Sequence, residues 1–275
     1  MEFKLEKANY EIEKIKFNVD GIFNDKIKPP FANASFFLTI IGKPGSGKTN
    51  LLVNMLTNKN IYKRVFDKVL LVMPKNSIKS LKNNIFEDLP ESQQFNELSP
   101  DVFETIKQFR EEFDEVEDQP LQRLNQNEHT GSKGGPPPLK KPRSKNMLLI
   151  LDDITAQLKE KENQKLLIEL STNRRHLKLS IILISQYLRA IPRCVRSQTT
   201  NLVYFKPANE LDNNIVRDEY INLPKETFNN LMRFVFQNQH DLKNHDQFFQ
   251  YLKTFHTELR LKMQLQLPLY VLKFQ

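Results

Sequence analysis

The feature that most constrains the fold is an eight-residue glycine-rich segment, GKPGSGKT, at residues 42–49. The chain holds only 7 glycines among its 275 residues, and three of them fall inside this segment. A short apolar run at residues 36–41 comes before it and is typical of a strand buried on both faces. After it, the apolar side chains of residues 51–56 recur with the spacing of a helix. The pattern predicts a strand, a tight turn and a helix in direct succession.

The segment matches the phosphate-binding pattern G-x-x-x-x-G-K-[ST], also called the P-loop or Walker A motif, in full. Its glycines let successive backbone N–H groups converge on a phosphate, and the positive end of the following helix points at the same anion. Lys48 supplies a charge for the β- and γ-phosphates of ATP, and Thr49 supplies a hydroxyl for Mg²⁺. A glycine turn without a ligand is the alternative. The candidate nucleotide-binding residues are Gly42, Lys43, Pro44, Gly45, Ser46, Gly47, Lys48, Thr49 and Asn50.

Four further apolar runs predict strands, at residues 69–73, 147–151, 179–185 and 202–205. Leucines at helical spacing within residues 166–170 mark a helix between the runs at residues 147–151 and 179–185. Strands that are apolar throughout and alternate with helices favour a parallel sheet covered on both faces. The predicted fold class is therefore α/β.

The composition divides the chain into an N-terminal extension, an ATPase core and a helical C-terminal extension, at residues 1–34, 35–207 and 208–275. The core contains a segment, residues 111–146, that is first acidic and then rich in proline and glycine, which is typical of a flexible, solvated insertion. A nuclear-import signal is the alternative for its KKPRSK. Apolar stripes over residues 228–235 and 248–259 predict two helices in the C-terminal extension.

Composition also excludes several classes of protein. The chain is 39% hydrophobic and 27% charged, as an ordinary globular protein is. Its single cysteine, Cys194, excludes an internal disulfide and a cysteine-based zinc site. The apolar runs are far shorter than the ~20 residues that span a bilayer, and the first residues lack the apolar centre of a signal peptide. We therefore expect a soluble, intracellular protein that is not transmembrane.

A second element of the phosphate site is LLILDD, at residues 148–153. A buried strand that ends in acidic residues places Asp152 at the carboxyl edge of the sheet, where open α/β sheets bind ligands. Asp152 is the candidate Mg²⁺ ligand, together with Thr49. Asp153 is the candidate general base that polarises the attacking water. The alternative is an aspartate that caps a helix expected over residues 156–170.

The strand at residues 179–185 lies between a basic pair, Arg174 and Arg175, and a polar residue, Gln186. Its seven residues at ~3.3 Å each separate these two ends by roughly 23 Å. If Gln186 contacts the γ-phosphate or the water, the arginines cannot reach the nucleotide of their own chain. Such an arginine can act only across a subunit boundary, as an arginine finger. A solvated helix end that complements the helix dipole is the alternative.

The formal charge of +8 is unevenly distributed. Residues 91–130 carry 11 acidic side chains against 3 basic ones, whereas residues 170–209, the basic segment, carry seven basic side chains and no acidic one. This bias favours a surface that faces a polyanion. No base-reading motif accompanies it, so we expect any contact with DNA to be to the backbone and independent of sequence. The phosphates of the nucleotide are a competing explanation for one or two of the arginines.

Three segments together resemble a known family. GKPGSGKT, LLILDD and NRRHLKLSIILISQYLRAIP are similar to motifs of the genome-packaging ATPases of poxviruses and other nucleocytoplasmic large DNA viruses. That family lies within the FtsK/HerA superfamily of DNA-pumping ring ATPases. The third segment is the most specific, because many P-loop ATPases share the first two. The resemblance covers about residues 30–206.

Carried onto this sequence, the resemblance implies a role for each motif residue. It makes Asp152 the Walker B acid, Asp153 the catalytic carboxylate and Gln186 the sensor. Arg175 falls at the position of the arginine finger that acts in trans. Two residues depart from the wider pattern: the superfamily usually has Glu where this chain has Asp153, and relatives often have Gly where it has Arg174.

The resemblance also implies a fold and a function. The fold is a three-layer P-loop NTPase with a mainly parallel central sheet, in which the strand that precedes Gln186 lies between the Walker A and Walker B strands. The function is a translocase driven by Mg²⁺ and ATP that packages double-stranded viral DNA into a capsid. It would work as a homo-oligomeric ring, a hexamer or a pentamer, with capsid or virion membrane proteins as partners. Its place would be the viral factory in the host cytoplasm, and the virion.

Two other functions stay open from the sequence. A P-loop kinase of nucleotides or small molecules would need a phosphoacceptor pocket, and usually a lid that carries an arginine. A DNA-binding scaffold gated by ATP would bind DNA without moving it. ATP turnover that rises with duplex DNA separates a translocase from both.

Overall fold

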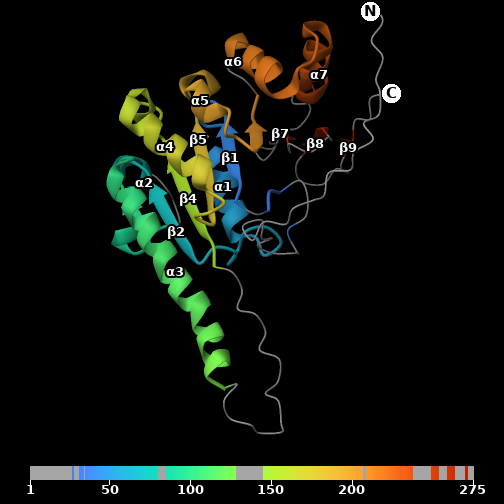
Figure 1. The fold of residues 1–275 in the computed structure, drawn as a ribbon. Helices are drawn as coiled ribbons and strands as arrows, with labels where there is room; N and C mark the ends of the chain where they lie inside the picture. Colours follow the sequence, from blue (N-terminus) through green and yellow to red (C-terminus); the bar gives the residue numbers. More distant parts are fainter. Residues whose placement is uncertain are drawn as a thin grey trace, which may run out of the picture.

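The structure is a computed structural model that describes residues 27, 31–33, 35–79, 85–127, 145–206 and 209–237, and three strands beyond residue 248. Six strands form one sheet in the order β3-β2-β4-β5-β1-β6, and every neighbouring pair is parallel (Figure 1). The predicted α/β fold is confirmed. The strands are β1 (Phe37–Ile41), β2 (Lys68–Val72), β3 (Gln94–Phe95), β4 (Met147–Asp152), β5 (Leu179–Ser185) and β6 (Asn201–Tyr204).

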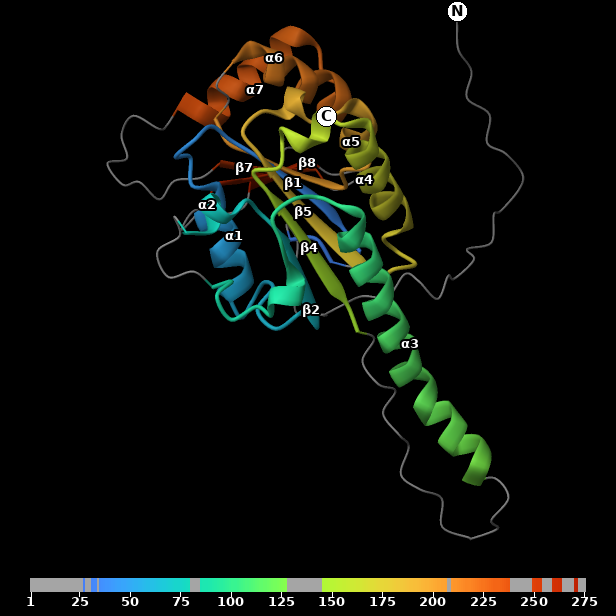
Figure 2. The ribbon, with the colours of Figure 1, turned by 90° about the vertical axis from the view of Figure 1, so that its left-hand side faces the viewer.

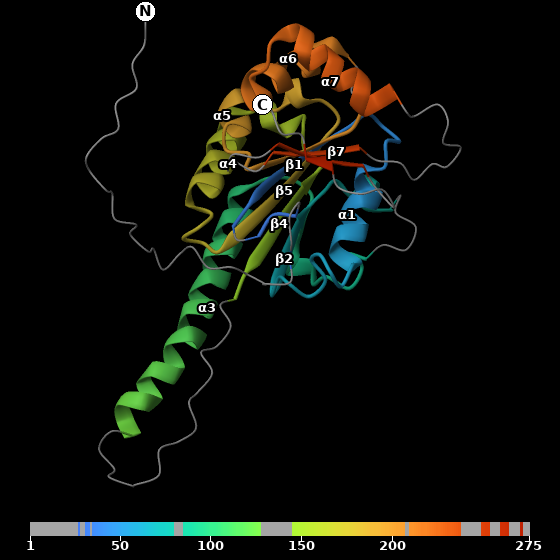
Figure 3. The ribbon, with the colours of Figure 1, turned by 90° about the vertical axis from the view of Figure 1, so that its right-hand side faces the viewer.

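Helices cover both faces of this sheet (Figures 2 and 3). α1 (Lys48–Thr57) packs on the first face, and α3 (Pro100–Asn127) and α4 (Lys161–Asn173) pack on the second, where α7 (Lys225–Gln237) adds Phe228 to the core. None of the helices in the described ranges is long and apolar enough to cross a membrane. The shorter helices are α2 (Lys75–Lys79), α5 (Arg193–Arg196) and α6 (Glu210–Ile215).

Strands buried on both faces explain why the runs are apolar throughout. In β4, Leu148 and Ile150 pack against the α1 side, whereas Leu149 and Leu151 pack against the side of α3 and α4. Successive side chains of a strand point to opposite faces, so each face of the sheet takes every second residue. The result is two apolar clusters, one on each face of the sheet.

The strand order places β5 between β1 and β4, as the resemblance implies. Ile41, the last residue of β1, pairs with Ser185, and Asp152, the last residue of β4, pairs with Ile184. All strands run in the same direction, so their carboxyl ends lie at one edge of the sheet. The segments that follow β1, β4 and β5 therefore meet there.

The flexible insertion expected from residue 111 is wrong for residues 111–127, because α3 continues to Asn127. The acidic run belongs to a helix whose apolar stripe, including Ile106 and Phe113, is buried against the sheet. The Arg110 side chain also pairs with Asp114 one turn later. Glu, Gln and Arg are good helix formers, so the high charge content of this run does not by itself indicate a loop. Residues 128–144 lie outside the described residues.

The C-terminal extension is only partly helical. The helix expected over residues 228–235 is present as α7, and its Phe228 is buried in the core. The helix expected over residues 248–259 is wrong: β7 (Phe249–Lys253), β8 (Leu259–Met263) and β9 (Tyr270–Val271) form an antiparallel sheet instead. The sequence of β8, LRLKM, alternates apolar and charged residues with the period of a strand. The three-part division of the chain stays a prediction.

Truncating the apolar stripe of α3 tests whether this helix is part of the core. We expect Ile106→Ala to lower the free energy of unfolding by about 2–4 kcal/mol, because the side chain is fully buried and leaves a cavity. Gln108→Ala, at an exposed position of the same helix, should change it by less than about 0.5 kcal/mol. Denaturant titration measures both, and equal effects would show that α3 does not pack on the sheet.

Candidate active site

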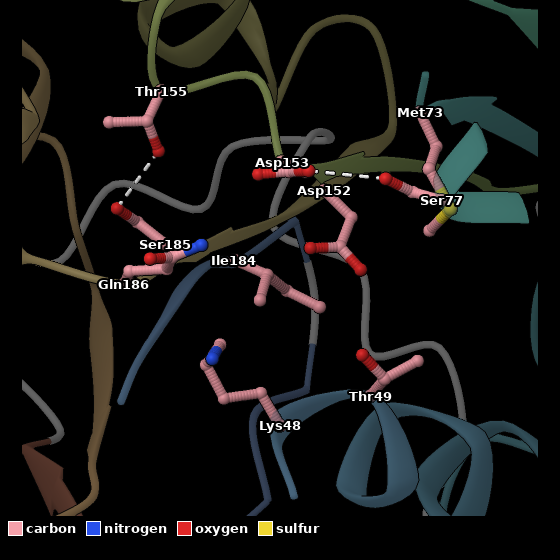
Figure 4. A pocket seen from close by; sticks show the side chains of 10 residues that line it. All are labelled: Lys48, Thr49, Met73, Ser77, Asp152, Asp153, Thr155, Ile184, Ser185 and Gln186. Carbon is pink, nitrogen blue, oxygen red and sulfur yellow. Dashed lines mark hydrogen bonds between the residues drawn. The ribbon is translucent and has the colours of Figure 1, made fainter. Parts of the chain in front are cut away.

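A cavity of about 200 Å³ lies at the carboxyl edge of the sheet, where β1, β4 and β5 end (Figure 4). Its side chains come from the P-loop helix and from the segments after three strands. Five of the residues predicted from the sequence line it together, namely Lys48, Thr49, Asp152, Asp153 and Gln186. The remaining lining residues are Met73, Ser77, Thr155, Ile184 and Ser185.

The P-loop needs its glycines for different reasons. Gly42 is buried, and a Cβ atom there would lie 2.5 Å from the Oγ atom of Ser46 and 2.9 Å from the Cβ atom of Phe205. Gly45 and Gly47 have φ angles of 71° and 90°, which side-chain-bearing residues rarely adopt. The Ser46 hydroxyl is buried and has no hydrogen-bond partner among the described residues. Because the Ser46 Oγ atom is buried without a hydrogen-bond partner, this loop fits a polar ligand that would bond to it.

Lys48 folds back over the P-loop. Its Nζ atom donates hydrogen bonds to the carbonyl oxygens of Gly42, at 2.7 Å, and Lys43, at 3.0 Å. Burial lowers the pKa of the ammonium, and the nearby carboxylates of Asp152 and Asp153 act in the opposite direction. The site therefore holds a half-buried cation whose present partners are neutral carbonyls, and a phosphate oxygen is a stronger partner for it.

The two aspartates differ in their surroundings. Asp152 ends β4, and its carboxylate points toward Thr49 (Figure 4). Burial, with the charge of Asp153 as a second cause, raises the pKa of Asp152 to about 6, although Lys48 opposes the shift. Asp153 is exposed and has a φ angle of 59°, and its Oδ2 atom accepts a hydrogen bond of 3.1 Å from the Oγ atom of Ser77.

Gln186 directly follows β5, and hydroxyl groups fix the start of its segment. The Ser185 Oγ atom donates to the carbonyl oxygen of Tyr187 at 3.0 Å and lies 3.1 Å from the Oγ1 atom of Thr155. The Ser185 carbonyl in turn accepts a hydrogen bond from the Gly42 N–H. The P-loop and the segments after β4 and β5 are thus joined by hydrogen bonds.

Sequence reasoning missed three polar residues of the cavity, Ser77, Thr155 and Ser185. All three lie at the end of a strand or within five residues after it. Short hydroxyl-bearing residues at the carboxyl ends of parallel strands were the available signal.

Seven residues of the predicted P-loop set do not line the cavity. Gly42 is buried beneath the loop, and Ser46 and Gly47 are half-buried in it. Lys43, Pro44 and Gly45 form the exposed outer part of the loop. Asn50 is exposed on α1, where its carbonyl accepts a hydrogen bond from the side chain of Asn54.

The structure does not bring the basic pair into the cavity. The Arg174 guanidinium donates hydrogen bonds to the carbonyls of Ser35, just before β1, and Ser171, in the last turn of α4. It therefore lies at the edge where the strands begin, opposite Gln186. Burial, with the charge of Arg175 as a second cause, lowers the pKa of Arg174. Arg175 is exposed.

The basic segment is not a uniform outward-facing surface. The Arg196 side chain is only 10% exposed and forms two hydrogen bonds, of 2.8 and 2.7 Å, with the carboxylate of Glu219. Arg196 therefore adds no free charge to the expected polyanion-facing surface, because an acidic residue outside the segment neutralises it. Arg189, Arg193 and Lys206 are exposed.

No group of three His, Cys, Asp or Glu side chains that could hold a metal ion occurs in the described part of the chain. Cys194 is exposed and forms no disulfide in the described part of the chain. The His- and Asp-containing stretch at residues 240–246 lies outside the described residues.

Comparison with known proteins identifies the family. The model of the family described as "Poxvirus A32 protein" matches residues 27–245. The chain belongs to this family. No curated protein matches the sequence. The family and the fold together make the chain a nucleotide-binding P-loop ATPase.

Two solved structures are similar to this A32-family chain at low sequence identity, and the first of them shares its fold. The genome packaging NTPase B204 from Sulfolobus turreted icosahedral virus 2, in complex with AMP, is 14% identical. The match covers 86% of this chain and 100% of B204, with a TM-score of 0.50. The cytoplasmic domain of the type VII secretion ATPase EccC from Thermomonospora curvata is 16% identical, covering 68% of this chain and 23% of that one, with a TM-score of 0.40.

The raised pKa of Asp152 predicts a pH-dependent effect of Asp152→Asn on stability. The folded-state pKa of about 6 lies above the ordinary value of 3.8, so the ionised carboxylate costs stability in the folded protein. That cost is absent below about pH 4, grows between pH 4 and 6, and is complete above about pH 6. In the presence of a chelator and without nucleotide, we expect Asp152→Asn to be more stable than the wild type at pH 8 by an amount on the order of 2 kcal/mol.

Denaturant titration at several pH values measures this difference. The exposed Asp88 provides a matched control, because Asp88→Asn makes the same substitution far from the cavity. An advantage of Asp152→Asn that is equally large at pH 4 and pH 8 would contradict the electrostatic explanation.

Proposed function

We propose that this A32-family ATPase packages a viral genome by moving double-stranded DNA into a capsid, as a homo-oligomeric ring. The observation that carries the proposal is the meeting of Lys48, Asp152, Asp153 and Gln186 at one cavity, while Arg175 lies at the far edge of the sheet. No arginine in the described part of the chain lines this cavity, and a neighbouring subunit can supply one. The fold shared with the genome packaging NTPase B204 supports the same function.

The residues at the cavity fit ATP with Mg²⁺. The P-loop glycines leave room for a polyphosphate beside the backbone, and the Ser46 hydroxyl can donate a hydrogen bond to it. Thr49 and Asp152 face each other and offer the oxygen ligands that Mg²⁺ prefers. When bound, the ion neutralises charge on the phosphates as the terminal bond breaks. Asp152 must be ionised to bind the metal, so metal binding should weaken as the pH falls below its raised pKa of about 6.

Hydrolysis then uses the chain's own groups in distinct roles. The Lys48 ammonium moves from the loop carbonyls to phosphate oxygens. Asp153, on the turn after β4, accepts a proton from the attacking water. Gln186, across the cavity, orients that water or the γ-phosphate as a hydrogen-bond donor and acceptor.

Arg175 acts on the nucleotide of the next subunit. Arg174 is already held by the carbonyls of Ser35 and Ser171, so its side chain serves its own fold. Arg175 is exposed beside it at the same edge. In a ring, the edge of one subunit that carries Arg175 faces the cavity edge of its neighbour, and the arginine stabilises negative charge in the transition state.

DNA contacts the exposed arginines that follow Gln186. Arg189 and Arg193 lie in the segment directly after β5, at the edge of the sheet that carries the cavity. The Arg189 backbone N–H donates to the buried carboxylate of Asp212, which ties this segment to α6. A displacement of Gln186 on hydrolysis would therefore also move Arg189 and Arg193, which follow it within a few residues. The protein would act in the host cytoplasm at viral factories, on a capsid or a virion membrane protein.

Duplex DNA should stimulate ATP hydrolysis severalfold, and the stimulation should fall steeply between 50 and 200 mM salt, because backbone contacts release counterions. Steady-state ATP turnover with and without a long DNA duplex measures this. Lys48→Ala should abolish turnover in both conditions. Turnover that does not respond to DNA at low salt would contradict translocation and favour a kinase or another ATPase role.

The double variant Arg189→Ala, Arg193→Ala should lose the DNA stimulation while the basal turnover stays within about twofold. Lys59→Ala, Lys63→Ala is a matched control, because it removes the same charge from exposed positions after α1, at the opposite edge. Equal losses in both double variants would show that DNA responds to overall charge and not to this segment.

Mixed rings test the role of Arg175. Arg175→Ala subunits keep an intact cavity, and Asp152→Ala subunits keep an intact arginine. Each variant alone should be inactive, whereas co-assembled at equal amounts about a quarter of the interfaces combine both intact halves and should hydrolyse ATP. Arg174→Ala keeps both the cavity and Arg175, so it should be active alone, and its mixture with Asp152→Ala should give no more than the average activity of the two components. A co-assembled mixture with no activity above that of its components would refute a finger supplied in trans.

A further inference from the structure

Ser77 lines the cavity from the segment after β2, a strand that carries none of the sequence motifs. It lies on the short helix α2, which follows β2. β2 is the direct neighbour of β4, with Val72 opposite Leu151, so the segments after the two strands lie side by side. The Ser77 Oγ atom donates its hydrogen bond to the Oδ2 atom of Asp153 across this boundary.

The hydrogen bond restrains a side chain that has little other support. Asp153 is exposed, and its left-handed backbone conformation carries the side chain out of the alternation of β4. Ser77 holds one carboxylate oxygen. The other oxygen lies on the side of Gln186 (Figure 4) and accepts no hydrogen bond from the described part of the chain. One oxygen is thus anchored and the other is presented to the cavity.

We propose that Ser77 is a positioning residue for ATP hydrolysis, which fixes the rotamer of Asp153 so that its second oxygen meets the attacking water. The proposal rests on the proposed role of Asp153 as general base. A base must lie within hydrogen-bond reach of the proton that it accepts, and a displacement of about 1 Å can cost on the order of a hundredfold in rate. An orienting hydroxyl therefore affects the chemical step and leaves nucleotide binding to the P-loop.

The local fold does not depend on this hydroxyl. The Ser77 backbone N–H donates to the Pro74 carbonyl at 2.9 Å and closes the turn that begins α2. That hydrogen bond survives the loss of the side chain. Because the hydroxyl lies on a cavity wall and not in the core, its removal leaves no buried void.

The test compares Ser77→Ala, Ser77→Thr and Asn76→Ala with the wild type. We expect Ser77→Ala to lower kcat about ten- to a hundredfold, with KM for ATP, binding of a non-hydrolysable ATP analogue and Tm unchanged. Ser77→Thr keeps the hydroxyl and should recover most of the rate. Asn76→Ala alters the adjacent exposed residue of α2 and should keep the wild-type rate.

The outcomes separate this proposal from the one it rests on. Asp153→Asn, assayed in parallel, should lower kcat further than Ser77→Ala does. If Asp153→Asn keeps wild-type turnover, the role of Asp153 fails and that of Ser77 fails with it. If Asp153→Asn is inactive but Ser77→Ala keeps or exceeds the wild-type rate, Ser77 does not align the base, and only the present proposal is overturned. A loss in Ser77→Ala that Ser77→Thr does not recover, or a matching rise in KM, also overturns it.

Discussion

The parallel direction of all six strands is the constraint on which the site depends. Because every strand ends at the same edge, residues more than a hundred positions apart in the sequence, such as Lys48 and Asp152, come to line one cavity. The insertion of β5 between β1 and β4 adds Gln186 to that edge. The other end of β5 lies at the opposite edge of the sheet. The segment around β5 therefore places Gln186 at one edge and Arg174 and Arg175 at the other. The apolar strands between them hold the two ends at a fixed separation.

The electrostatics of the cavity are arranged for a ligand that brings its own charge. Lys48 is half-buried against carbonyl oxygens, and Asp152 is buried beside a second carboxylate, so burial disfavours the charged form of each. Phosphate oxygens relieve the first cost and a divalent cation relieves the second. The isolated fold therefore pays a stability penalty at the residues proposed to bind nucleotide and metal, which is the pattern expected where stability and function compete. Met73 and Ile184 are buried at the cavity wall and lower the local dielectric constant, which increases the cost of charge on both Lys48 and Asp152.

Most of the sheet could be predicted, since β4 and β5 are apolar on both faces and stand out without any knowledge of their partners. What failed depends on contacts that a sequence pattern does not contain. Residues 111–127 are highly charged, and only the docking of Phe113 against the sheet distinguishes their helix from a solvated loop. The apolar spacing within residues 248–259 fits a helix, whereas Phe249–Lys253 forms a strand that pairs with β8, whose residues alternate between apolar and charged. In the site, the motif residues were predictable from spacing. Ser77 was not, because its role arises from the adjacency of β2 and β4.

The two arginines before β5 show how neighbouring identical side chains acquire different roles. Arg174 is withdrawn into its own subunit by two backbone carbonyls, and its burial beside another cation already disfavours its charge. A residue bound in this way would have to give up both hydrogen bonds before it could reach a neighbour. Arg175 is exposed at the same edge. By fixing the end of α4 against the start of β1, Arg174 also fixes the backbone from which Arg175 projects. A basic residue at position 174, where relatives often have glycine, thus stiffens the base of the proposed finger without competing for its target.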